Sequence, residues 1–174
     1  IGRKRVKKPL TVPAMNLRAM TYESARAIFR SARKLKTTAF LFEIAKSEIG
    51  YTFQPPAEYA TQILAGAIRE GWKGPVFIQG DHFQVNARKF AADPVREKEE
   101  LKRLILDALA NGFYNIDIDA STLVDLSKHG LEEQQRVNAE VCAEMTAFIR
   151  AHQPKGVEVA IGGEIGEVGQ KNST

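Results

Sequence analysis

The chain has 174 residues, of which 44% are hydrophobic and 26% charged, and this composition is typical of a soluble folded domain. The net charge of +4 becomes −1 without five basic residues near the start, which are Arg3, Lys4, Arg5, Lys7 and Lys8. A nearly neutral body without a basic stripe argues against a nucleic-acid-binding protein, and the lack of a long apolar run argues against a membrane protein.

Residues 1–8 are therefore predicted to be a flexible basic tail, and residues 9–174 to form a domain or part of one. The only cysteine is Cys142, so an intramolecular disulfide and a cysteine metal cluster are both excluded. No signal-peptide pattern is present, and the expected location is the cytoplasm.

Short apolar runs alternate with helical patterns along the chain. The runs predict strands at Leu10–Asn16, Thr38–Ala45, Pro75–Gln79, Phe113–Asp119 and Val157–Ile161. Between them, apolar residues at helical spacing predict amphipathic helices, and Pro55-Pro56 and Asp93-Pro94 have the composition of helix starts. This alternation predicts parallel strands joined by helical crossovers.

Two architectures share such an alternation, an open doubly wound sheet and a (β/α)8 barrel of the TIM type. No GxGxxG fingerprint follows the first strand, which weakens the first option. Polar residues instead recur at the strand ends, namely Asn16, Glu43, Asp81, Asp119 and Glu164. Because that face carries the active site of a parallel barrel, we expect a TIM-type barrel of which this chain covers about the first five strand–helix units.

The segment Gln79–Asn86 contains the densest group of chemically active residues. A histidine such as His82 can bind a divalent metal while a neighbouring carboxylate such as Asp81 carries a proton. A hydrogen-bonded turn can use the same two residue types. The dipeptide alone leaves both interpretations open.

Four segments together resemble the class II, metal-dependent ketose-bisphosphate aldolases. They are VPAMNLRAM (Val12–Met20), GDHFQVN (Gly80–Asn86), IDIDAST (Ile116–Thr122) and VEVAIGGEIGEVG (Val157–Gly169). The resemblance implies a TIM barrel and a lyase of carbohydrate metabolism. The implied reaction is the reversible aldol cleavage of a phosphorylated ketose to dihydroxyacetone phosphate and an aldehyde, with zinc or another divalent metal as cofactor.

The same resemblance implies roles for individual residues. His82 corresponds to a metal ligand of the family, and Asp81 to the acid/base that acts at the aldehyde oxygen. Glu164 is assigned as a second metal ligand. The residues expected to contact substrate are Asn16, Glu43, Asn86, Asp119 and Ser121.

Two segments depart from the catalytic members of the family. Gln79–His82 stands where those members have HxDH, and Val157–Gly162 where they have VExELG, with Ala160 unable to bind a metal. The patterns GDHxxxN and IGxE are closer to the non-catalytic subunit of tagatose-bisphosphate aldolase. The family takes further histidine ligands and its phosphate-binding glycine loop from strands six to eight, so this chain alone is expected to be an incomplete enzyme.

Three functions therefore remain open: a metal-dependent aldolase, a non-catalytic barrel subunit that stabilises an aldolase partner, and a metal-free module that binds a sugar phosphate. Barrel architecture does not separate them. Either a homo-oligomer or a complex with an aldolase partner subunit is expected, because five strands do not close a barrel.

Overall fold

Five short strands form one parallel sheet in the order in which they occur in the chain. The computed structural model describes residues 12–37 and 39–165, so the predicted basic tail lies outside the described residues. The strands are β1 (Ala14–Asn16), β2 (Leu41–Ala45), β3 (Phe77–Gln84), β4 (Phe113–Asp119) and β5 (Ala160–Gly163). Each pairs in parallel with the next. This sequential order confirms the predicted barrel-type sheet, because a doubly wound sheet reverses its strand order.

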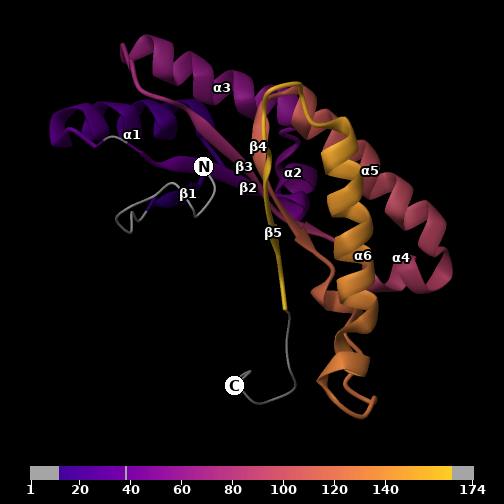
Figure 1. The fold of residues 1–174 in the computed structure, drawn as a ribbon. Coiled ribbons are helices and arrows are strands. Elements are labelled where there is room, and N and C mark those ends of the chain that lie inside the picture. The colour runs from indigo at the N-terminus through magenta and orange to yellow at the C-terminus, as the bar shows by residue number, and fades with distance from the viewer. Residues whose placement is uncertain (1–11, 38, 166–174) are drawn as a thin grey trace.

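Helices connect the strands along one side of the sheet (Figure 1). The long ones are α1 (Thr21–Leu35), α3 (Pro56–Arg69), α5 (Pro94–Ala110) and α6 (Leu131–His152). Two short helices that the sequence did not predict, α2 (Lys46–Thr52) and α4 (Ala87–Ala92), follow the ends of β2 and β3, and a 3-10 turn, η2 (Ser121–Leu123), follows β4. Among the described residues, no helix combines the length and the apolar character that crossing a bilayer requires.

The predicted helix starts are confirmed. Pro55 and Pro56 stand at the beginning of α3, and Asp93 precedes Pro94 at the beginning of α5. The Asp93 carboxylate accepts a hydrogen bond of 3.0 Å from the Arg96 amide, so it satisfies one of the free N–H groups of the first turn. Pro94 fits the first turn because its missing N–H would have no partner there.

The core lies between the sheet and these helices. Its largest fully buried side chains come from both layers and include Phe29, Phe42, Tyr59, Ile105, Phe113 and Met145. The Phe29 ring lies 5.2 Å from the Phe42 ring, centre to centre, so α1 is packed directly on β2. The strand order leaves β1 and β5 as the two edges of the sheet.

Two predicted strand ends were wrong. β3 does not stop at Gln79 but continues to Gln84, because its later residues also pair with β4, with Gly80 opposite Ile116 and Gln84 opposite Asp119. β5 runs from Ala160 to Gly163 rather than from Val157 to Ile161, because the Val157 amide is used in a turn that it closes with the Pro154 carbonyl. Both corrections extend a strand toward the face that carries the polar residues.

Candidate functional site

A cavity of about 690 Å³ lies at the carboxyl ends of the first four strands. The last residues of these strands all line it: Asn16, Ala45, Gln84 and Asp119. Its other lining residues come from the strands and from the segments that follow them, and they are Arg18, Glu43, Ser47, Glu48, Asp81, His82 and Ser121. This end of a parallel barrel is where active sites occur.

The structure gathers most of the residues that the sequence singled out. Six of the eight line the cavity, namely Asn16, Glu43, Asp81, His82, Asp119 and Ser121. Glu164 follows β5, and its Oε1 lies 4.0 Å from Nδ1 of His82. Asn86 lies outside this group, because its side chain caps α4 and accepts a hydrogen bond of 3.0 Å from the Lys89 amide.

Asp81 and His82 are adjacent in β3, yet both line the cavity. In a regular strand, successive side chains face opposite sides. His82 has a φ of 42°, in the left-handed region that residues other than glycine rarely adopt, and the pairing with β4 shifts between Gly80 and Phe83. Irregularities of this kind redirect a side chain, and here the shift turns both reactive groups to the same side.

The Asp119 carboxylate anchors the His82 ring. Oδ2 of Asp119 lies 3.2 Å from Nδ1 of His82 and accepts a hydrogen bond of 2.7 Å from Gln84, while Oδ1 accepts hydrogen bonds from the amide and the hydroxyl of Ser121. Burial alone would raise the pKa of Asp119, but the hydrogen bonds from Ser121, Gln84 and His82 hold that pKa below its ordinary value. Asp119 therefore stays ionised and fixes the imidazole, as carboxylates do for metal-binding histidines.

The charges around His82 favour its protonated form in this structure. Burial lowers the pKa of His82, whereas the carboxylates of Asp81, Asp119 and Glu164 raise it, and the net shift is upward. The pKa of Glu43 in the same cavity is also raised, first by burial and then by the charge of Asp81. The site is thus rich in negative charge and suited to a cation.

Asp117 is a site residue that the sequence analysis missed. It stands two residues before Asp119 in β4, and strand alternation therefore places both carboxylates on the same face of the sheet. Burial, followed by the charge of Glu164, raises the pKa of Asp117 to about 6. The alternation of aspartates in the IDID segment was the signal that could have identified it.

His82, Asp117 and Glu164 form a group that could hold a metal. One ligand atom from each lies within 4.8 Å of the other two. One imidazole nitrogen and two carboxylate oxygens suit a divalent cation such as Zn²⁺ or Mn²⁺. The residues present therefore fit the metal that the sequence analysis expected.

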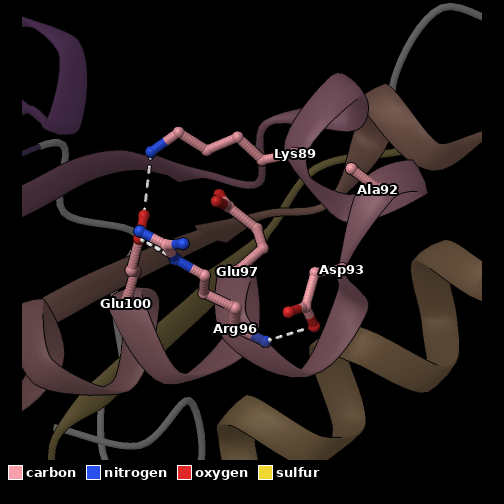
Figure 2. A pocket seen from close by; sticks show the side chains of 6 residues that line it. All are labelled: Lys89, Ala92, Asp93, Arg96, Glu97 and Glu100. Atoms are coloured by element: carbon pink, nitrogen blue, oxygen red, sulfur yellow. Dashed lines mark hydrogen bonds and ion pairs between the residues drawn. The ribbon is translucent and has the colours of Figure 1, made fainter.

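A second, smaller cavity of about 310 Å³ lies outside this site, where α4 meets α5 (Figure 2). Lys89 and Arg96 both pair there with Glu100, at 2.8 and 3.3 Å, so the two cations share one carboxylate. Glu97 is buried, and its Oε1 lies 3.0 Å from the Lys46 ammonium, which also donates to the Gln84 carbonyl. Lys46 therefore links α5 to the end of β3, where Gln84 lines the main cavity.

Comparisons with known proteins place this geometry in a family. The pattern of the family described as fructose-bisphosphate aldolase class-II matches residues 3–174. No curated protein sequence matches the chain. Among solved structures, the chain is similar to a probable tagatose 6 phosphate kinase from Sinorhizobium meliloti 1021, with a TM-score of 0.59 and 18% sequence identity.

That alignment covers 83% of this chain and 38% of the other, and at this identity it shows the fold alone. The chain thus spans well under half the length of that structural neighbour. The family match, in contrast, covers nearly the whole sequence and includes all four segments that resemble aldolases. The chain belongs to the class II fructose-bisphosphate aldolase family.

Proposed function

We propose that this chain supplies the metal and proton-transfer part of an aldolase site, for the reversible cleavage of a phosphorylated ketose to dihydroxyacetone phosphate and an aldehyde. Family membership supports an aldolase-type function. The observation that carries the proposal is the cavity in which Asp81 and His82 lie on the same side, with Oδ2 of Asp81 at 4.0 Å from Nε2 of His82.

His82 and Glu164 would hold the divalent metal in this proposal, and Asp119 keeps the His82 ring in place. The metal, when bound, supplies a Lewis acid that withdraws electrons from the ketose carbonyl. Asp81 accepts the proton of the substrate hydroxyl as the neighbouring carbon–carbon bond breaks. The electron pair of that bond remains on the three-carbon fragment, which takes up one proton from water to become dihydroxyacetone phosphate, and the hydroxyl carbon becomes the aldehyde. In the reverse direction, Asp81 returns the proton.

Asn16, Glu43 and Ser121 lie in the cavity and are candidates for contacts with the substrate hydroxyls. Asn86 is less well placed for this role, since its side chain caps α4. The phosphate groups need cations or free amides. The cavity lining has four carboxylates and a single arginine, Arg18, which already pairs with Glu48 at 2.5 Å. We therefore expect the phosphate contacts to come from strands that complete the barrel.

The experiment uses the whole protein to which these residues belong, purified and supplied with Zn²⁺ or Mn²⁺, because this chain is proposed to hold only part of the site. Metal content is measured first, and fructose and tagatose bisphosphates are then tested as substrates by coupling dihydroxyacetone phosphate release to NADH oxidation. We expect one metal per chain and metal-dependent cleavage of at least one of these ketoses. A protein that holds metal but releases no dihydroxyacetone phosphate would contradict the enzymatic proposal.

A second candidate is a non-catalytic barrel subunit that stabilises an aldolase partner. The Gln79–His82 segment favours it, because that segment departs from the catalytic pattern. The open edge of the sheet agrees with a docking role, since an apolar groove of about 330 Å³ beside β1 is lined by α1 residues such as Ile28 and Leu35. The Leu35 side chain is 76% exposed.

These open surfaces predict that the 174-residue chain, produced alone, associates with itself. Unpaired parallel strand edges and apolar helix faces are unfavourable in water and are covered by pairing with another chain. Light scattering coupled to size-exclusion chromatography should give a mass well above the 19.3 kDa of one chain. A stable monomer of that mass would argue against the barrel-edge interpretation.

A further inference from the structure

We propose that Asp117 is a third ligand of a divalent metal ion bound together with His82 and Glu164, and that Gly162 provides the space for it. The inference rests on the proposed function, because it identifies how this chain would hold the metal introduced there. It differs from the set of ligands suggested by the sequence, in which only His82 and Glu164 come from this chain.

Gly162 and Asp117 are direct neighbours in the sheet. They occupy paired positions in β5 and β4. A Cβ atom added to Gly162 would lie 2.5 Å from Oδ1 of Asp117, which is closer than carbon and oxygen atoms approach. A residue with a side chain at position 162 would therefore displace the Asp117 carboxylate. β4 therefore supplies the Asp117 carboxylate, and the missing side chain of Gly162 in β5 leaves room for it.

The Asp117 carboxylate lacks the partners that its neighbour on the same face has. Among residues 12–37 and 39–165, Oδ2 of Asp117 is buried and has no hydrogen-bond partner. Asp119, two residues later, accepts hydrogen bonds from Gln84 and from Ser121. Buried carboxylate oxygens are normally hydrogen-bonded, paired with a cation or bound to a metal. A cation between Asp117 and its two neighbours would provide the missing partner.

The three ligand atoms need to move only slightly closer together to bind one ion. The three ligand atoms lie within 4.8 Å of one another, whereas atoms bound to one ion at ~2.1 Å stand about 3–4 Å apart. The Glu164 side chain is 42% exposed, so it has room to rotate toward Asp117 while Asp119 holds the His82 ring. Movements of about 1 Å by such side chains lie within ordinary rotamer adjustment.

The three ligands come from successive strands, with His82 in β3, Asp117 in β4 and Glu164 directly after β5. Three protein ligands are the usual number for a catalytic zinc ion, with the remaining position left for water or substrate. One imidazole and two carboxylates also accept Mn²⁺. The described strands thus carry three candidate protein ligands for one ion.

The test compares metal binding by the wild-type protein and by Asp117→Asn, Gly162→Ala and Asp125→Asn. Asparagine keeps the shape of Asp117 but removes its charge, and the added methyl at position 162 displaces the Asp117 carboxylate. Asp125 lies in the loop after η2, and its carboxylate accepts a hydrogen bond from the Ser127 hydroxyl. Asp125→Asn is therefore the matched control. Zn²⁺ and Mn²⁺ affinities are measured by calorimetry, the visible spectrum of bound Co²⁺ reports the ligand set, and circular dichroism checks the fold.

We expect the wild type to bind one ion per chain. Changes to residues that merely support ligands weaken metal binding by ~10–100-fold, so Asp117→Asn should weaken it by about 100-fold or more and alter the Co²⁺ spectrum. Gly162→Ala should act in the same direction, and Asp125→Asn should leave both readouts unchanged. This pattern in folded variants supports the inference.

Unchanged affinity and an unchanged Co²⁺ spectrum in Asp117→Asn would overturn the inference, whatever the activity of the wild type. If binding depends on Asp117 but the wild type cleaves no ketose bisphosphate, the inference stands and the proposed function fails. If the wild type binds neither Zn²⁺ nor Mn²⁺, both fail.

Discussion

Replacing Asp81 by alanine should slow aldol cleavage by ~10²–10⁴-fold while the metal remains bound, because this is the usual contribution of a positioned acid or base. Asp81 lines the cavity beside His82, and in the proposed mechanism it moves the substrate proton without holding the metal. The measurement is kcat for dihydroxyacetone phosphate release, together with the metal content of the same preparation.

Glu43 provides the informative comparison for Asp81. Its carboxylate lies in the same cavity, and its pKa is raised, first by burial and then by Asp81. Glu43→Gln should therefore change turnover less than Asp81→Ala if Asp81 is the proton carrier. The opposite ranking would transfer that role to Glu43. Unchanged turnover in Asp81→Ala would remove Asp81 from the mechanism.

The second large effect is expected for His82→Ala, which should lose bound metal and activity together. Removing one of the three candidate ligands weakens binding and opens the coordination shell to water. It also leaves the buried Asp119 carboxylate without its imidazole partner at 3.2 Å. We expect metal affinity to fall by about 100-fold or more and cleavage to fall to background. Metal analysis and the coupled assay on the same sample measure both.

His129→Ala is the control for His82→Ala. His129 is exposed in the segment that precedes α6 and is not one of the residues that line the cavity. Its replacement should leave metal content and turnover unchanged. Full metal occupancy in His82→Ala would show that the ion binds elsewhere and that His82 is not one of its ligands.

The order of the sheet could be predicted from the sequence because each strand and long helix has its own periodic pattern. The short helices α2 and α4 could not, since seven and six residues are too few to show a helical repeat. Missing α4 had a consequence for Asn86, because the sequence did not predict that its side-chain oxygen caps that helix. Its contact with substrate stays a prediction.

The candidate site could be predicted where residues stand at the ends of strands with a clear apolar pattern, as Asn16 and Asp119 do. The predicted end of β3 was wrong because Gly80–Gln84 has no apolar alternation. Pairing with β4 extends the strand through this segment. Asp117 was missed because an aspartate inside a strand was not considered beside the one at its end. The family, in contrast, was identified from the motifs, and the match to residues 3–174 confirms it.

The strands lie in the sheet in the same order as in the chain, and this order also affects how the protein folds during synthesis. Each strand pairs with the one synthesised immediately before it, so no strand waits for a distant segment before it finds its partner. Such sequential topologies keep loop closures short, and the sheet can grow unit by unit as the chain leaves the ribosome. At every stage, the newest strand presents an unpaired edge to the next unit. During synthesis, this moving edge is the surface that a chaperone would need to shield.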